Sequence, residues 1–145
     1  TDLQINFLSL VKVIQSVLPN LLASEQASIV AFSSVAATMG MPFHTSVAAS
    51  KGAIEGFAKA LAAEYAPKIR VNVIAPSLTD TPLADKFLNN ETKQEKSAER
   101  HPLKRFGKPE DSAQMATFLL SDKSSWISGQ IFHVDGGMST LLVNG

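Results

Sequence analysis

The residues best suited to chemistry follow the predicted strands of this chain. Ser33 and Ser34 end one apolar run, and Ser77 and Thr79 follow a second. In an open α/β sheet the carboxyl ends of parallel strands share one rim, and ligands bind at that rim. Lys51 lies in the first turns of the helix after the first run, so it can face the same rim. These hydroxyl and ammonium groups together indicate a candidate active site.

Each of these residues also has a purely structural explanation. A lone lysine in a helix is usually solvated, and a serine at a strand end usually forms a turn. A third polar group, Asp135 with Gly136 and Gly137, follows the third predicted strand. Because all three strand ends place polar residues on the same rim, we favour the functional interpretation.

Apolar periodicity predicts the helices and strands that position these residues. Residues 2–22 have a broad apolar face with helical spacing, and Pro19 is expected to kink that helix or end it early. Between 77 and 108 we expect a loop with a short helix, followed by a connector. The remaining predicted elements are helices at 46–65 and 110–121 and strands at 28–34, 69–75 and 130–134.

The alternation of helices and strands predicts an α/β fold. We expect a Rossmann-like parallel sheet with flanking helices and right-handed crossovers. Three strands make a small sheet, because doubly wound folds usually have about five or more. A three-stranded parallel sheet would also expose an edge. We therefore expect residues 1–145 to form a single partial domain, the C-terminal part of a doubly wound fold.

Composition narrows the classes of partner. Thirteen basic and thirteen acidic residues cancel, and there is no basic stripe, so nucleic acid is not an expected partner. The absence of cysteine excludes disulfides, a thiolate nucleophile and cysteine-bound metal, and no metal site is expected. No apolar run approaches the roughly 20 residues of a membrane span. We expect a cytoplasmic protein without a membrane partner.

Two stretches together resemble one protein family. The first is VAFSS followed by VAASKGAIEGFAKALAAEYAPKIRVNVIAPSLTDTPL, and the second is HPLKRFGKPEDSAQMATFLLSDKSSWISGQIFHVDGG. Both are similar to the central and C-terminal regions of the short-chain dehydrogenase/reductase family, and the resemblance covers essentially the whole chain. It implies a Rossmann sheet that binds NAD or NADP, and oxidation or reduction of a small-molecule alcohol or carbonyl.

The resemblance also implies catalytic positions. Asn6 matches the family's helix asparagine, which holds a proton-relay water, and Ser34 matches the serine that polarises the substrate oxygen. Lys51 matches the lysine that binds the nicotinamide ribose and lowers the pKa of a tyrosine. That tyrosine belongs four residues before the lysine, where this chain has Val47. Valine cannot transfer a proton, and a positioned acid–base group typically contributes roughly 10²–10⁴-fold to the rate.

Other side chains are poor substitutes for that tyrosine. Histidine is an acid–base residue type, but His44 is expected to lie a turn away, and Tyr65 is too far along the helix. The family's glycine-rich phosphate loop has no counterpart in these 145 residues, so we expect weak dinucleotide binding by this segment alone. The positions implied to contact the cofactor are Lys51, Pro76, Ser77, Leu78, Thr79 and Thr81, with Pro-Ser in place of the family's Pro-Gly.

Two functions remain open at this stage. The first is a divergent NAD(P)-linked oxidoreductase of the short-chain dehydrogenase/reductase type, weak or inactive as this segment. The second is a non-catalytic binding or assembly protein that retains the fold and its oligomer interfaces. In the family, the helix at 46–65 and the one before it pair with their copies across a two-fold axis. Small residues along this helix fit close helix approach, so a homodimer or homotetramer is expected.

Overall fold

The centre of the molecule is a parallel sheet of three strands. The computed structural model describes residues 1–144. The strands are β1 (Ala27–Phe32), β2 (Ile69–Pro76) and β3 (Ile131–Val134), in the order β1-β2-β3. Ala27 pairs with Ile69 at one end of the sheet, and Val73 pairs with Ile131 across β2 and β3. The predicted parallel α/β sheet is therefore confirmed, although the first strand ends two residues earlier than expected.

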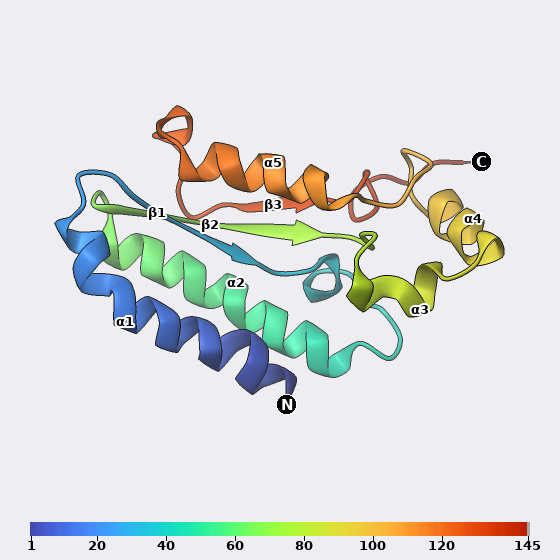
Figure 1. Cartoon of the computed structure of the whole chain (residues 1–145), viewed down its shortest axis with the longest axis horizontal. Helices are drawn as coiled ribbons and strands as arrows, with labels where there is room; N and C mark the ends of the chain where they lie inside the picture. Colours follow the sequence, from blue (N-terminus) through green and yellow to red (C-terminus); the bar gives the residue numbers. More distant parts are fainter. Residues whose placement is uncertain (145) are drawn as a thin grey trace.

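Helices cover both faces of this sheet (Figure 1). The helices α1 (Ser9–Ala23) and α2 (Thr45–Tyr65) lie on one face, and α5 (Pro109–Leu120) lies on the other. Two short helices, α3 (Asp85–Leu88) and α4 (Glu91–Arg100), extend beyond the carboxyl ends of the strands. The remaining turns of helix are η1 (Leu3–Leu8), η2 (Val35–Ala37), η3 (Pro82–Ala84) and η4 (Asp122–Ser124).

The first helix differs from its prediction in two ways. It begins with a π-helical turn, η1, and it runs through Pro19 to Ala23, so the expected early end is wrong. Proline removes one backbone donor and leaves the carbonyl of residue i−4 without its partner. Here Pro19 and Gln15 are both exposed, so water can satisfy that carbonyl and the helix continues.

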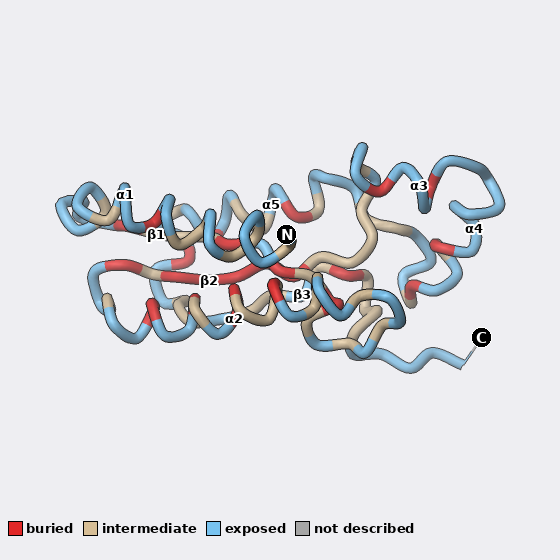
Figure 2. Tube along the Cα trace, turned by 90° about the horizontal axis from the view of Figure 1, so that it is seen from below, coloured by how far each residue is buried: buried red, intermediate tan, exposed pale blue. Residues whose placement is uncertain are grey.

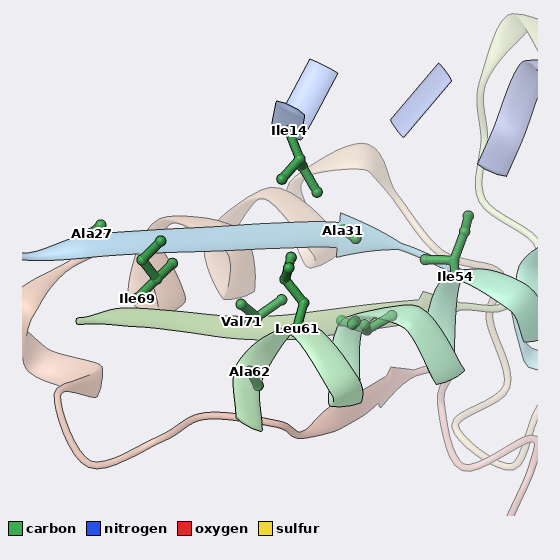
Figure 3. Packing of buried hydrophobic residues seen from close by; sticks show 10 residues of the cluster. Ile14, Ala27, Ala31, Ile54, Leu61, Ala62, Ile69 and Val71 are labelled. Carbon is green, nitrogen blue, oxygen red and sulfur yellow. The ribbon is translucent and has the colours of Figure 1, made fainter. Parts of the chain in front are cut away.

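The core fills the space between the sheet and the two-helix layer. β2 is buried along almost its whole length because it has a strand on each side and a helix layer on each face (Figure 2). Figure 3 shows Ile14 of α1 and Leu61 of α2 pointing toward the strands. Small side chains such as Ala58 and Ala62 allow α2 to approach the sheet closely. Burying one Leu or Ile side chain contributes about 1.5–3 kcal/mol, so this cluster holds the layers together.

Arg70 of β2 ties α5 and the following turn to the sheet. Its guanidinium donates to the carbonyls of Leu119, Ser121 and Ser124 at 2.9–3.1 Å. A cation at a helix C-terminus is favourable because the last carbonyls lack partners and the helix dipole is negative there. Asn72, fully buried, binds the backbone on both sides of the turn before β3. These polar contacts fix where β3 begins.

The helix at Leu3–Ala23 is long and apolar enough, by length and composition alone, to cross a membrane. The expectation that no segment would meet these criteria is therefore wrong. Core helices of soluble proteins and signal sequences meet the same test, and only 6% of the apolar window of this helix is buried. One set of its apolar side chains packs on the core. Those side chains are Phe7, Leu10, Ile14, Leu18 and Leu21.

Candidate functional site

The strand ends surround a cavity of about 450 Å³, called here the larger cavity. Asp135, Gly136 and Gly137, which follow the third strand, line a different cavity. Every residue that the family resemblance implied to be catalytic or to contact the cofactor lines this one, except Asn6. These residues are Ser34, Lys51, Pro76, Ser77, Leu78, Thr79 and Thr81. The outer wall comes from the segment around α3 and α4, with Leu83, Phe87, Ser97, Arg100 and His101. The topology therefore gathers at one rim the residues that the sequence placed after separate strands.

The two serines after β1 have different environments. Ser33 is buried and donates from Oγ to Glu55 Oε1 of α2 at 2.6 Å. Ser34 lies at the start of η2, where its Oγ accepts from the backbone N–H of Ala36 at 3.1 Å. That contact uses the acceptor side of the hydroxyl, and its hydrogen remains available to the cavity. Ser34 is therefore the serine positioned to donate to a ligand oxygen.

Lys51 reaches from α2 to the end of β1. Its Nζ donates to the carbonyl of Phe32 at 3.1 Å, and burial lowers the pKa of the ammonium group below its usual value. Burial disfavours the charged form because the ammonium loses water. The single backbone contact leaves two of its three N–H donors for other partners. Lys51 is thus a partly desolvated cation held at the cavity wall.

Val47, at the position of the family's tyrosine, also lines the larger cavity. It lies one turn before Lys51 on α2, so an aliphatic side chain faces the place where a phenol is expected. His44, which the sequence interpretation set aside, lines the same cavity. Its Nδ1 is 2.7 Å from the carbonyl of Pro42, and this nitrogen must donate because a carbonyl only accepts.

Asn6 is the predicted site residue that the structure does not bring to the cavity. It lies in η1, and its side-chain amide donates to the carbonyl of Asp2 at 3.1 Å. Asparagine here satisfies a backbone oxygen of the π-helical turn. Its catalytic role stays a prediction.

Ser77 is hydrogen bonded to a histidine that the sequence interpretation missed. Ser77 Oγ lies 2.8 Å from Nε2 of His101, and Nδ1 of His101 lies 2.7 Å from the carbonyl of Ser97. His101 is only 4% exposed. The sequence offers no motif for this pair, because His101 is 24 residues from Ser77 and follows the charged helix α4.

A smaller cavity of about 320 Å³ lies on the other side of Ser77 and His101. Arg105 and Asp111 form a two-point ion pair in its wall, with N–O distances of 2.7 and 2.9 Å. The pKa of Asp111 falls to about 2 because Arg105 and the Lys108 N–H donate to its carboxylate. Burial acts to raise the pKa of Asp135, but hydrogen bonds from Ser139 and Gly137 outweigh it and lower that pKa.

The charged groups of the larger cavity are cationic. Lys51 and Arg100 line it, and no Asp or Glu is among its lining residues in the part of the chain that the structure describes. Within residues 1–144, no cluster of three His, Cys, Asp or Glu side chains is arranged to hold a metal ion. The arrangement favours a ligand with anionic or hydroxyl groups over a metal ion.

Known proteins have a similar fold and a related sequence. The family model described as enoyl-(acyl carrier protein) reductase matches residues 1–139. The chain is 41% identical over 137 residues to 3-oxoacyl-[acyl-carrier-protein] reductase FabG of Thermotoga maritima, covering 94% of this chain and 55% of that protein. It is 38% identical over 132 residues to inactive 2-(S)-hydroxypropyl-CoM dehydrogenase 2 of Xanthobacter autotrophicus, covering 88% and 57%.

A solved structure of a dehydrogenase has the same fold over most of this chain. Gluconate 5-dehydrogenase from Burkholderia cenocepacia, in complex with NADP and tartrate, aligns with a TM-score of 0.87 and 28% identity. The alignment covers 94% of this chain and 54% of that one. The chain therefore spans about half the length of the relatives it matches. On the match to residues 1–139 and the relatives above, this chain belongs to the short-chain dehydrogenase/reductase family.

Proposed function

We propose that this chain supplies the substrate side of an NAD(P)-linked oxidoreductase that interconverts a carbonyl and an alcohol. The observation that supports it most directly is the larger cavity, where Ser34, Lys51 and the segment 76–81 meet. A hydroxyl donor and a partly desolvated ammonium group on one cavity wall fit a ligand with oxygen atoms. The catalytic and cofactor roles of these residues rest on their match to the family's motifs.

The residues present fit the nicotinamide end of such a cofactor. Lys51 offers two free N–H donors for ribose hydroxyls, and Ser77, Thr79 and Thr81 line the adjoining wall. A pyrophosphate needs a glycine-rich turn opening a helix, and α2, the helix at this rim, begins at His44 and Thr45 without one. When bound, a nicotinamide cofactor supplies or accepts the hydride. We infer that this chain alone binds a dinucleotide weakly.

The chain's own residues then bind and orient the substrate. Ser34 donates its hydroxyl hydrogen to the carbonyl oxygen and stabilises the negative charge that develops there. Lys51 holds the ribose and adds positive potential at the same wall. Val47 provides an apolar surface that excludes water but moves no proton. The cationic lining, Lys51 with Arg100, favours a substrate that has a carboxylate or phosphate group.

Turnover by the full-length protein that the gene encodes tests this proposal. NADH or NADPH consumption is followed with a panel of carbonyl compounds, some with a carboxylate and some without. Lys51→Ala should lower kcat/KM strongly, whereas Lys59→Ala, an exposed lysine two turns further along α2, should leave it unchanged. Equal activities of the two variants, or no turnover of any carbonyl, would count against the oxidoreductase.

A second candidate is a non-catalytic assembly protein. The aliphatic Val47 favours it, as does an apolar surface on the first helix. Six apolar side chains of Leu3–Ala23 are exposed in the single chain: Leu3, Ile5, Leu8, Val13, Val17 and Leu22. These six side chains, called here the apolar strip, expose more apolar surface than one helix of a soluble monomer usually does, which is typical of a contact surface.

The same surface supports a homodimer or homotetramer for either function. Gly52 and Gly56 of α2 have open space where a side chain would be. Glycine inside a helix costs about 1 kcal/mol relative to alanine, and nothing in the single chain requires it at these two positions. A second copy packed closely on α1 and α2 explains both the glycines and the apolar strip. A cytoplasmic location is part of this proposal, and cell fractionation with an antibody to the protein tests it.

A further inference from the structure

His101 is held at both ring nitrogens. Nδ1 lies 2.7 Å from the carbonyl of Ser97, and Nε2 lies 2.8 Å from Ser77 Oγ. The ring is buried at the end of α4, where His101 follows the last helical residue. Two short contacts and burial fix its orientation.

These contacts determine the tautomer. A carbonyl only accepts, so Nδ1 of His101 has the hydrogen that points to Ser97. In the neutral ring Nε2 is then the basic nitrogen, and it accepts from the Ser77 hydroxyl. When the ring is protonated, Nε2 donates to Ser77 Oγ, and the hydroxyl hydrogen can turn toward the cavity. The ring therefore gains or loses a proton without rotating, as an acid–base group must.

Ser77 connects this ring to the larger cavity. Ser77 and His101 both line that cavity together with Ser34, Lys51 and Val47. The other histidine on the wall, His44, has one contact, from Nδ1 to Pro42, and lies on the loop before α2. Of these two histidines, His101 is the one whose basic nitrogen already faces a hydroxyl at the cavity.

We propose that Ser77 and His101 form a proton relay that does the work of the missing phenol at Val47. This proposal rests on the proposed oxidoreductase function. In reduction, the carbonyl carbon accepts a hydride from the reduced nicotinamide cofactor, and the carbonyl π electrons move to oxygen. That oxygen takes the Ser77 hydroxyl proton, and Ser77 Oγ takes the proton from Nε2 of His101. The products are the alcohol, the oxidised cofactor and a neutral imidazole, which solvent reprotonates.

Charged groups face the pair from both cavities. Lys51 and Arg100 are the cationic side chains that line the larger cavity, and His44 lines it as well. The smaller cavity adds a histidine, an ion pair and a carboxylate, which are His133, Arg105 with Asp111, and Asp135. The Asp135 carboxylate already accepts from the backbone N–H groups of Gly137 and Ser139. The pH dependence of the relay reflects this set of charges as well as the ring itself.

Nitrogen NMR of the imidazole tests the relay without any turnover. In the neutral ring of His101 we expect the hydrogen on Nδ1, and we expect Ser77→Ala to move the titration midpoint of that ring. Ser125→Ala serves as the matched control, because Ser125 is an exposed serine that lines neither cavity. A neutral ring with its hydrogen on Nε2, or a midpoint that Ser77→Ala leaves in place, would overturn the relay.

Kinetics of the full-length protein provide the second test. Ser77→Ala and His101→Asn should each lower kcat by roughly 10²-fold, and the double variant should be no slower than either single one. Asparagine keeps a donor near Nδ1 for the Ser97 carbonyl, and circular dichroism checks the fold. His101→Asn should also change the pH profile of kcat, an effect that a purely structural role would not produce.

The outcomes separate the two proposals. If the wild-type protein reduces a carbonyl and His101→Asn keeps its rate and pH profile, the relay is wrong and the oxidoreductase stands. If the wild-type protein turns over no carbonyl, the oxidoreductase proposal is wrong. The relay proposal is then wrong as well, whichever tautomer of His101 is found. A separate NMR result of Nε2 protonation rejects the relay even when turnover is found.

Discussion

Val47 lies one helical turn before Lys51 on α2, and both side chains line the larger cavity. A hydroxyl-bearing ring at this position would face Ser34 across the same cavity. Lys51 is already partly desolvated there, and its positive charge lowers the pKa of a neighbouring phenol. Position 47 is therefore a place where a side chain with a hydroxyl group could act as a proton donor.

Val47→Tyr should raise the reductase rate of the full-length Ser77→Ala variant, in which the proposed relay is broken and a phenol can take its place. The gain is expected to be roughly 10²-fold, because a positioned acid–base group contributes about that much. Val47→Phe is the matched control, since it adds the ring without the hydroxyl. Stopped-flow measurement of NAD(P)H consumption checks the difference. Identical rates for the Tyr and Phe variants would show that the missing hydroxyl at position 47 does not limit the reaction.

Because the pKa of Lys51 is lowered in the folded state, the free energy of unfolding should increase as the pH rises toward 10.5. Burial lowers the pKa of its ammonium group in the folded state below that of the unfolded chain. In the window between the two values the unfolded state binds more protons, so the free energy of unfolding increases with pH. Urea unfolding between pH 8 and 10.5 measures this slope. Lys51→Gln should reduce it and Lys59→Gln should not, and equal slopes would contradict the assignment.

Asp111 should lose stabilising contacts as the pH falls from about 4 to about 2. Its folded pKa is about 2, below the usual 3.8, so its contribution is present above the unfolded pKa and lost through the folded one. Arg105 is 52% exposed and Asp111 is 30% exposed, so screening by solvent keeps the effect small. Asp111→Asn should reduce the fall of the melting temperature with decreasing pH in this window. Asp122→Asn, which has no such partner, should leave the wild-type slope intact.

Val13→Glu should break the proposed homodimer. Val13 is 59% exposed in the apolar strip of the first helix, and a buried, unpaired carboxylate at an interface is costly. Light scattering after size exclusion measures the mass. Leu120→Glu, on α5 at the opposite face of the sheet, should keep at least a dimer. A monomeric wild-type protein, or a dimeric Val13→Glu variant, would show that the strip has another role.

Gly107→Ala should destabilise the wall between the two cavities. A Cβ at Gly107 would lie 2.9 Å from Thr79 Oγ1 and 3.3 Å from the Leu78 carbonyl. Such crowding typically costs about 1–3 kcal/mol. Gly40→Ala is the control, because that Cβ would meet open space. Thermal unfolding compares the two, and equal melting temperatures would mean that the segment 77–79 moves aside freely.

Most of the fold was predictable from the sequence because its elements have strong local signals. β2 reads as a continuous apolar strand because it is buried on both faces, and the alternation of helix and strand predicts parallel pairing. The end of the first helix was not predictable in this way. Proline leaves the carbonyl of residue i−4 without its partner, and whether water reaches that carbonyl, as it can at the exposed Gln15, is a property of the packed structure.

The rim of the site was predictable, but the pairing within it was not. Ser34, Lys51 and the segment 76–81 meet because parallel strands end on one side, which the pattern of strands already implies. The contact between Ser77 and His101 depends on the path of the chain through α3 and α4, and no periodicity describes that path. Asn6 was matched by position, yet its amide is bonded to Asp2 within its own turn.

Ser33 and Ser34 are neighbours of one residue type, but they differ in what evolution or a protein engineer can change. Ser33→Ala would leave the carboxyl of Glu55 buried without its donor, and such a group costs at least about 1–3 kcal/mol. Ser34→Ala would free only one backbone N–H at the edge of a cavity that water can enter. A library that varies this pair together would thus mix loss of folding with loss of function, whereas a change at Ser34 alone tests function in a chain that still folds.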